Sequence, residues 1–228
     1  MAKKFFSKIN LNWRAYAAEF LGTFVFVLIS LGAALADTID GQLGLLGISI
    51  ASGFVYMAMV FATVGISGGH LNPAISLSLW FAKKLSTFDV IFYILAQFMA
   101  GLAAAGVLFY IFGQDTVLSL QTAGGVSMQT AVAVEAIMAA VLVFVYFATL
   151  VDRKGPSSFG PFALGLTVVA SYLFAAPVFG SFINPAKALA FSLLSSSYSE
   201  LVFWMVGPFT GSLFGLVYEF LFLRKTSK

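Results

Sequence analysis

The sequence predicts an all-α membrane protein with six transmembrane helices, two re-entrant half-helices and an inverted internal repeat. The composition is 61% hydrophobic and 9% charged, and the mean hydropathy is +1.00, values typical of a membrane protein and not of a water-soluble globule. The basic residues fall into clusters that separate apolar segments, and the tripeptide Asn-Pro-Ala occurs twice inside such segments. These three observations together predict the fold class.

Six apolar segments reach the length of about 20 residues that a spanning helix requires. Two of them, 43–82 and 155–199, are 40 and 45 residues long, which leaves room for two crossings or for one crossing and a further element. We expect the first segment to be a transmembrane helix and not a cleaved secretory signal, because it is too long for one and contains Glu19. The segments are 13–36, 43–82, 88–112, 129–151, 155–199 and 201–223.

The positions of the basic residues predict the topology. Eleven of the twelve Lys and Arg lie in four clusters, and the intervening connections contain acidic residues but no basic ones. Because basic flanks face the cytoplasm, we expect both termini to be cytoplasmic and each long segment to hold one full helix and one re-entrant segment. The net charge of +3 then belongs to membrane flanks, which argues against a nucleic-acid partner. The clusters are Lys3, Lys4, Lys8 and Arg14; Lys83 and Lys84; Arg153 and Lys154; and Arg224, Lys225 and Lys228.

The spacing of the two tripeptides indicates an internal duplication. Asn72 and Asn184 are 112 positions apart, and a glutamate inside an apolar segment precedes each of them, Glu19 by 53 positions and Glu135 by 49. Because each half holds three crossings, the second half is predicted to be inverted relative to the first. The halves comprise about residues 13–112 and 129–223 of a single transmembrane domain, 1–228.

Each tripeptide is typical of the start of a short helix, since asparagine is a strong N-cap and proline suits the first helical position. The residues between Pro73 and Lys83 span about 15 Å as a helix, half of a hydrocarbon core of about 30 Å. Two such half-helices entering from opposite faces meet near the midplane, where irregular backbone must be buried or line a water-filled cavity. The six residues concerned are Asn72, Pro73, Ala74, Asn184, Pro185 and Ala186.

This arrangement favours a pore for a neutral, hydrogen-bonding molecule. Each asparagine can cap its own helix through its carbonyl oxygen and donate from its NH₂ group to the pore occupant. Both half-helices also direct the positive ends of their dipoles at that point, which disfavours a cation. The carbonyl groups of residues 68–71 and 180–183 are expected to form acceptor ladders that lead to it.

These motifs resemble those of the aquaporin and glycerol-facilitator family, the major intrinsic proteins. The resemblance implies the aquaporin-like fold, a passive channel for water or small neutral solutes in the lipid bilayer, and a homotetramer with one pore in each subunit. It implies no cofactor and no metal. The similar stretches cover nearly the whole chain and are "AEFLGT", "SGGHLNPAIS", "YILAQFMAGLAAAG", "VEAIMAA", "FINPA" and "WMVGPFTGSLFG".

The resemblance also implies supporting roles for three residues of the loops. An acid inside the membrane is a functional candidate by default, but the resemblance implies that Glu19 and Glu135 hold the loop backbones by hydrogen bonds. His70 is the only histidine and could titrate as a gate. For His70, too, we expect a hydrogen bond that fixes the loop.

Four residues occupy the positions to which the family's selectivity filter is ascribed: Ser52, Tyr172, Ser181 and Lys187. The family usually has arginine at the last position and often a large aromatic residue at the first, so this chain departs at both. Lysine has a flexible stem and three donors where arginine has a rigid fork of five. We therefore expect a wider and more polar constriction than a strict water filter, unless Tyr172 or the Lys187 stem fills it.

Three functions remain open. The first is a passive water channel that excludes protons and cations, which Ala188 favours because glycerol-conducting members tend to carry aspartate there. The alternative is a facilitator of glycerol or another small neutral solute. Water channels of the family tend to have two aromatic residues at positions 204 and 205, and this chain has Trp204 but Met205 there, so these positions favour neither function. A non-conducting structural protein has little support, because the external connections are short. An enzyme is disfavoured, since the chain has one histidine and no cysteine and no visible nucleophile–base pair.

Overall fold

The computed structural model describes residues 12–121 and 126–223. Some of the basic residues on which the predicted cytoplasmic orientation rests lie outside these ranges. They are Lys3, Lys4, Lys8, Arg224, Lys225 and Lys228.

Six segments of the described chain are long and apolar enough to cross a membrane, in agreement with the sequence. The fourth span is α6 continued by a π-helical turn, and the sixth is built from two short helices and a final π-helical turn. The elements are α2 (Trp13–Asp40), α3 (Gly44–Ser67), α4 (Pro73–Phe81), α5 (Thr87–Leu118), α6 (Met128–Tyr146), η1 (Phe147–Val151), η2 (Ser157–Phe159), α7 (Gly160–Phe179), α8 (Pro185–Ser195), α9 (Leu201–Ser212), α10 (Phe214–Tyr218) and η3 (Glu219–Leu223).

Both long apolar segments divide into a spanning helix and a short helix. The first forms α3 and the nine-residue α4, and the second forms α7 and the eleven-residue α8. The short helices begin at Pro73 and Pro185, each directly after the asparagine that caps it. At 1.5 Å per residue both are too short to span a bilayer, so the predicted fold class of six spanning helices and two half-helices is confirmed.

The helices pack in a pattern that repeats between the two halves of the chain. α2 packs on α3 and α5, and in the same way α6 packs on α7 and α9. Each half-helix packs against both halves: α8 packs mainly against α5 of the first half and also against α9, and α4 packs against both α5 and α9. α3 and α7 join the halves along their lengths. This pairing is expected of two copies of one unit related by an internal two-fold axis.

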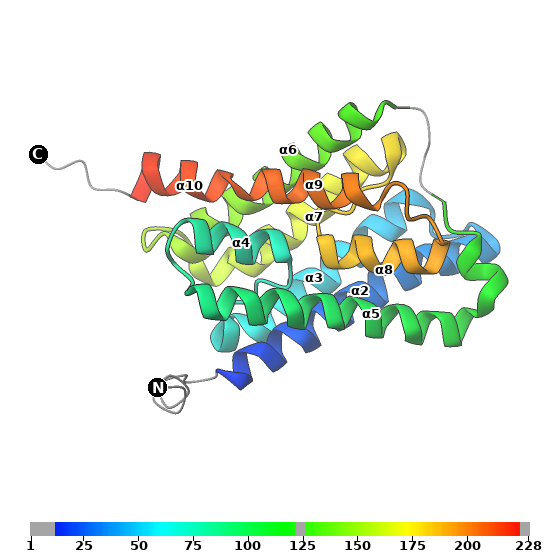
Figure 1. The fold of residues 1–228 in the computed structure, drawn as a ribbon, viewed down its shortest axis with the longest axis horizontal. Coiled ribbons are helices and arrows are strands. Elements are labelled where there is room, and N and C mark those ends of the chain that lie inside the picture. Colours follow the sequence, from blue (N-terminus) through cyan, green and yellow to red (C-terminus); the bar gives the residue numbers. More distant parts are fainter. Residues whose placement is uncertain (1–11, 122–125, 224–228) are drawn as a thin grey trace, which may run out of the picture.

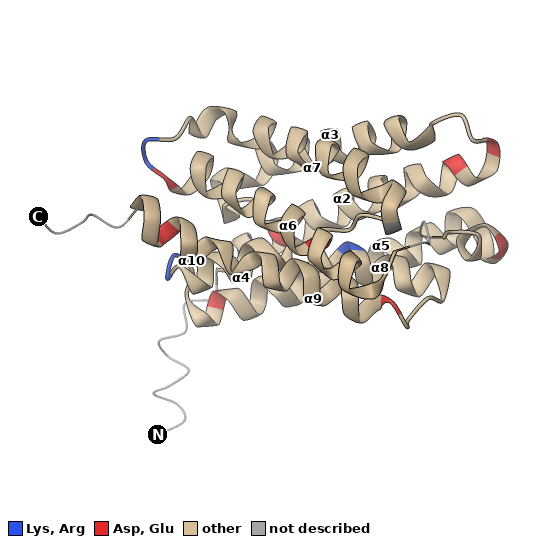
Figure 2. Ribbon diagram, turned by 90° about the horizontal axis from the view of Figure 1, so that it is seen from above, with Lys and Arg blue, Asp and Glu red and all other residues tan. Residues whose placement is uncertain are grey.

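The helices lie roughly along one long axis, with their connections at its two ends (Figure 1). The start of α2 and the end of η3 lie at the same end of the bundle. Figure 2 shows the charged residues mostly at the two ends, with the basic connections at one end and acidic connections at the other. The middle of the bundle is largely uncharged, as a hydrocarbon environment requires.

Close contact between α3 and α7 depends on a pair of facing glycines. A Cβ atom at Gly53 would lie 2.5 Å from the carbonyl oxygen of Gly165, and one at Gly165 would lie 2.6 Å from the carbonyl oxygen of Gly53. Both distances are below van der Waals contact, and backbone atoms cannot move aside as a flexible side chain can. The absence of side chains at these two positions is therefore what lets the halves approach each other.

Replacing Gly53 with alanine is expected to destabilise the protein by about 1–3 kcal/mol, because α3 and α7 must separate to admit the methyl group. The measurement is the midpoint of thermal denaturation in detergent. Gly65→Ala on the same helix is the matched control, since nothing lies within 4 Å of a Cβ atom at that position. Equal midpoints for the two variants would contradict the close-contact interpretation.

Candidate functional site

The two half-helices meet through a reciprocal pair of asparagine hydrogen bonds. Asn72 Nδ2 donates to the carbonyl oxygen of Ile183 at 2.9 Å, and Asn184 Nδ2 donates to that of Leu71 at 2.8 Å. Each Oδ1 accepts from the backbone of its own helix, at Ala74 N and Ala186 N, both at 2.9 Å. The expectation of a free NH₂ group thus needs refinement: one hydrogen of each amide binds the opposite loop, which leaves at most one hydrogen of each for another acceptor.

The residue before each asparagine adopts a left-handed backbone conformation. Leu71 has a φ of 51° and Ile183 a φ of 47°, a region that costs a residue with a Cβ roughly 1–2 kcal/mol. In this conformation each residue makes two hydrogen bonds. Its N–H donates to a glutamate, and its carbonyl oxygen accepts from the asparagine of the other loop. The strained conformation is therefore held by hydrogen bonds on both sides of the residue, at its N–H and at its carbonyl oxygen.

Glu19 and Glu135 anchor the two loops, but not equally. Glu135 accepts the backbone N–H groups of Phe182 and Ile183, at 2.7 and 2.6 Å. Glu19 accepts the N–H groups of His70 and Leu71. In addition it accepts from two side chains, Ser67 Oγ at 2.6 Å and Gln97 Nε2 at 2.8 Å. Both glutamates are almost fully buried. Because Glu135 accepts two hydrogen bonds and Glu19 accepts four, the glutamate of the second loop has fewer hydrogen-bond partners than that of the first.

Replacing Glu135 with glutamine is expected to destabilise the protein by about 1–3 kcal/mol, because the new NH₂ group must face a backbone N–H and leaves it unsatisfied. Thermal denaturation in detergent measures the loss. Glu219→Gln is the control, since that carboxylate pairs with Lys84 at 3.0 Å near the end of the bundle and such pairs contribute at most about 1 kcal/mol. An unchanged midpoint for Glu135→Gln would remove the anchoring role.

His70 lies within the first loop and is held from several sides. Its backbone N–H donates to Glu19, its Nδ1 lies 3.0 Å from Ser76 Oγ, and its ring is 4.8 Å from that of Tyr93 between centroids. The side chain is buried. This geometry suits a residue that fixes the loop.

Tyrosine and asparagine side chains use several of the loop carbonyl groups that were expected to form ladders. Tyr146 Oη donates to the carbonyl of Gly68 at 2.7 Å, and Tyr56 Oη donates to that of His70 at 2.9 Å. A carbonyl oxygen has two lone pairs, so each retains capacity for one further donor. The loops are thus fixed by protein donors before any solute is bound.

Lys187 lies on the first turn of α8, and its ammonium group is enclosed by the protein. Nζ donates to Tyr172 Oη at 2.6 Å and to the carbonyl oxygen of Ser181 at 3.5 Å. It lies 4.0 Å from the centroid of the Tyr172 ring and 5.4 Å from that of Phe182. The lysine is only 5% exposed. The structure therefore brings together three of the four predicted filter residues, namely Lys187, Tyr172 and Ser181.

Ser52, the fourth predicted filter residue, has no exposed surface. Its Oγ lies 2.8 Å from Ser30 Oγ on α2. The residue of α3 that lines the neighbouring cavity is Ser49, about one turn earlier. The Ser49 hydroxyl donates to the carbonyl oxygen of Leu45 at 2.7 Å. Ser52 is therefore not part of the wall of the cavity that Tyr172 and Lys187 line.

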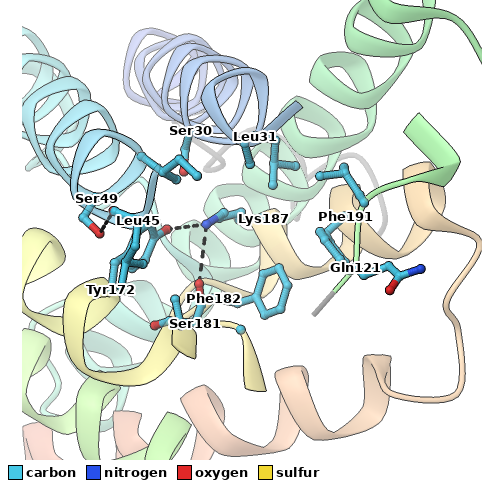
Figure 3. A pocket seen from close by; sticks show the side chains of 15 residues that line it. Ser30, Leu31, Leu45, Ser49, Gln121, Tyr172, Ser181, Phe182, Lys187 and Phe191 are labelled. Atoms are coloured by element: carbon cyan, nitrogen blue, oxygen red, sulfur yellow. Dashed lines mark hydrogen bonds between the residues drawn. The ribbon is translucent and has the colours of Figure 1, made fainter. Parts of the chain in front are cut away.

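A cavity of about 170 Å³ lies against this cluster. Figure 3 shows Lys187 at its centre, with Tyr172 and Ser30 on one side and Phe182 and Phe191 on others. One part of the wall is polar and the other is aliphatic or aromatic. The polar part comprises Ser30, Ser49, Gln121, Tyr172, Ser181 and Lys187, and the apolar part includes Leu31, Ala34, Leu45, Ile48, Leu120, Ala176, Phe182 and Phe191.

Sequence reasoning missed Ser30, Ser49 and Phe182 in this cluster. Ser30 is one of several hydroxyl residues in apolar segments, and nothing in its local sequence distinguishes it. Phe182 lies in the expected carbonyl ladder 180–183, but nothing marked its side chain, because one phenylalanine among 26 carries no signal. Only the packing of α2, α3, α7 and α8 brings these side chains together.

Comparisons with known proteins agree with this architecture. The model of the family described as "Major intrinsic protein" matches residues 6–218. Aquaporin Z of Photorhabdus laumondii subsp. laumondii is 32% identical, over 93% of this chain and 99% of that protein. Aquaporin TIP2-1 of Arabidopsis thaliana is 35% identical, over 92% of this chain and 88% of that protein.

A solved structure shows the same fold. The aquaglyceroporin from Plasmodium falciparum superposes with a TM-score of 0.80 at 21% identity, covering 93% of this chain and 97% of that one. The family match extends over both half-helices, the first five spans and most of the sixth. This chain therefore belongs to the major intrinsic protein family.

Proposed function

We propose that this chain is a passive water channel that excludes protons and cations. Membership of the family makes it an integral multi-pass membrane channel for water or small solutes and not an enzyme. The finer assignment to water rests on the reciprocal asparagine bonds. Asn72 and Asn184 are held at the meeting point of two helix N-termini, and each has one amide hydrogen left to donate.

This geometry suits water for a physical reason. A water oxygen at the meeting point accepts from both amides, so its own hydrogens point away from the asparagines along the pore axis. Two positive helix ends at the same place repel a hydrated proton or another cation. The ammonium group of Lys187 adds a formal positive charge near α7 that also repels cations. It is held there by its hydrogen bonds to Tyr172 Oη and to the carbonyl oxygen of Ser181.

The test is osmotic shrinkage of proteoliposomes in a stopped-flow instrument. We expect vesicles that contain the protein to shrink severalfold faster than empty vesicles, with a low activation energy. Shrinkage no faster than in empty vesicles would exclude the water channel, and together with absent solute uptake it would support a non-conducting structural protein.

The second candidate is a facilitator of glycerol or another small neutral solute. The two-sided lining of the cavity favours it, because a carbon skeleton can pack on the apolar wall while its hydroxyl groups face the polar one. Among the described residues, Ser181 Oγ has no hydrogen-bond partner and can serve such a solute. Swelling in isotonic glycerol tests this candidate, and a rate equal to that of empty vesicles would reject it.

The filter assignment, the assembly and the orientation are part of the same proposal. Ser52, Tyr172, Ser181 and Lys187 form the constriction, Glu19, His70 and Glu135 support the loops, and the halves at about 13–112 and 129–223 form one domain over 1–228. The channel is a homotetramer with both termini in the cytoplasm. Mass measurement in native detergent micelles tests the tetramer, and protease protection of terminal tags in oriented membranes tests the orientation.

A further inference from the structure

A buried run of polar side chains joins Glu19 on α2 to the ring of His70. Gln97 Nε2 on α5 lies 2.8 Å from Glu19 Oε2 and 2.9 Å from Ser76 Oγ on α4. Ser76 Oγ in turn lies 3.0 Å from His70 Nδ1. All four side chains are buried, so water cannot readily replace a missing partner. The hydrogens of this run must therefore be shared among its own members.

The carboxylate of Glu19 fixes the starting point of the run. Its Oε1 accepts from Ser67 Oγ and from the N–H of His70. Its Oε2 accepts from the N–H of Leu71 and from Gln97. An ionised carboxylate has about four acceptor sites, and all of them are used, so no site is left for a proton. Glu19 can therefore only accept, and the Gln97 atom that faces it must be the NH₂ nitrogen.

The direction of the other hydrogens follows from this nitrogen. One hydrogen of the Gln97 NH₂ group points at Glu19, and the second points at Ser76 Oγ, which accepts it. Among the described residues, the one further partner of Ser76 Oγ is His70 Nδ1, so the serine hydrogen has only that nitrogen to bind. A ring nitrogen that accepts a hydrogen bond carries no hydrogen itself, and the ring hydrogen then lies on the other nitrogen.

The amide oxygen of Gln97 supports this orientation. Oε1 is buried and has no hydrogen-bond partner among the described residues, which is unfavourable for an acceptor. The reverse orientation would place that oxygen against the carboxylate of Glu19, which cannot donate. Gln97 is thus held by its two hydrogens, at the cost of an unused acceptor.

The titratable groups around His70 favour a neutral ring. Those that face the residue come from four helices: Glu19 on α2, Tyr56 on α3, Tyr93 on α5 and Tyr146 on α6. Each tyrosine donates its hydroxyl hydrogen to a loop carbonyl, and the carboxylate already accepts four hydrogen bonds. A second ring hydrogen, on Nδ1, would point at a serine hydroxyl whose own hydrogen already lies between the two atoms.

We infer that Gln97 is a positioning residue of the channel: through Ser76 it holds the His70 ring neutral, with its single hydrogen on Nε2. Within the described residues the hydrogen bond of the ring is the one at Nδ1, so the Nε2–H group is available to a solute. The pore then has one more donor two positions before Asn72, and no further positive charge. The tautomer follows from the hydrogen bonds alone, whereas its role in permeation rests on the proposed function.

Nitrogen NMR of the single histidine tests the tautomer directly. His70 is the only histidine of the chain, so protein labelled with ¹⁵N-histidine and purified through a histidine-free tag reports on this ring alone. We expect Nε2 to carry a hydrogen and Nδ1 to carry none, at neutral pH and also at about pH 5, where a free histidine is largely protonated. A hydrogen on Nδ1 at either pH would overturn the inference.

Ser76→Ala tests the relay, with Ser78→Ala as the matched control. Both serines lie on α4 and have no exposed surface, but the hydroxyl of Ser78 bonds only its own helix, at Ile75 O. We expect Ser76→Ala to lower the ratio of the Nε2–H to the Nδ1–H tautomer at least about fivefold, the factor expected for one lost hydrogen bond. Ser78→Ala should leave the ratio unchanged. Equal ratios in the two variants would overturn the relay.

Gln97→Met tests the positioning residue itself, because methionine has similar length and no hydrogen to donate. Without that donor the Ser76 hydroxyl is free to accept from Nδ1, so we expect the tautomer ratio to fall by a similar factor. An unchanged ratio would overturn the role of Gln97. If this variant does not fold, the wild-type spectrum and the Ser76→Ala ratio still decide the inference.

Osmotic shrinkage of proteoliposomes tests the role in permeation. We expect the water permeability of the wild-type channel to be the same at about pH 7.5 and pH 5, because the ring takes up no proton in that range. A fall on acidification that is absent in His70→Gln would show that the ring becomes charged and would overturn the inference. If the wild type moves no water at either pH, the proposed function fails, and the NMR spectrum alone decides the tautomer.

Discussion

Lys187→Ala is expected to let cations permeate the channel, which we propose excludes them in the wild type. Two unit charges about 4 Å apart in surroundings of effective dielectric constant about 20 repel each other by about 4 kcal/mol, which corresponds to roughly a thousandfold in rate. The dipoles of α4 and α8 remain in the variant and keep part of the barrier. We therefore expect cation permeation to rise by about 10²- to 10³-fold.

The surroundings of Lys187 strengthen this expectation. The rings of Tyr172 and Phe182 lie 4.0 and 5.4 Å from Nζ, and aromatic faces attract cations. Without the lysine, these rings offer an incoming cation an attractive site. The variant thus loses a repulsive charge and uncovers an attractive surface in the same step.

Current through planar bilayers in sodium chloride measures the effect, with Lys187→Arg as the matched control. Arginine keeps the positive charge, so no cation current is expected. Its rigid five-donor fork should also hold the Tyr172 hydroxyl and the Ser181 carbonyl more firmly, which narrows the solute range and lowers glycerol permeability relative to water. Equal sodium currents in wild type, Lys187→Ala and Lys187→Arg would remove Lys187 from the filter.

The second large effect is expected at the meeting point of the half-helices. Asn72→Ala removes the N-cap of α4, the hydrogen bond to Ile183 O and the amide hydrogen proposed to face the pore. A cap contributes about 1 kcal/mol, and a buried carbonyl left without its donor costs about 1–3 kcal/mol more. We expect water permeability per channel to fall at least about tenfold and the thermal midpoint to fall as well.

Asn12→Ala separates capping from the pore role. Asn12 is the N-cap of α2 and accepts from Ala15 N at 3.4 Å, at the end of the bundle. Its loss should leave water permeability unchanged. Asn184→Ala should reproduce Asn72→Ala, because it breaks the matching bond to Leu71 O. Water permeability near wild type in either half-helix variant would contradict the proposed role of the pair.

The main features of the fold follow from local signals and the thickness of the bilayer. Asparagine followed by proline starts a helix whatever surrounds it, and α4 and α8 begin at the predicted residues. The apolar segment 88–112 ends where Gly113 interrupts the helical conformation of α5. Segment lengths and positions of basic residues then allowed one arrangement of six spans and two half-helices. None of these inferences requires knowledge of which helices touch.

The site was predicted less completely, and the missing parts are contacts between distant segments. The sequence placed Asn72 and Asn184 together through helix lengths, but not the bond from Asn72 to Ile183, 111 positions away. The resemblance to the family placed Lys187 at the expected filter position, three residues after Asn184, but the partner of its ammonium group depends on where α7 carries Tyr172.

The sequence by itself therefore determined that this protein spans a membrane six times and brings two helix N-termini to one point, because helix starts, apolar length and charge act locally. Tertiary structure alone decided which polar atoms meet there. Three contacts depend on side-chain directions across several helices. They are the bond from each asparagine amide to the opposite loop, the bond from Lys187 to Tyr172, and the contact between the serines on α2 and α3. A shift of one position around any of these helices changes them, while the local sequence signals stay the same.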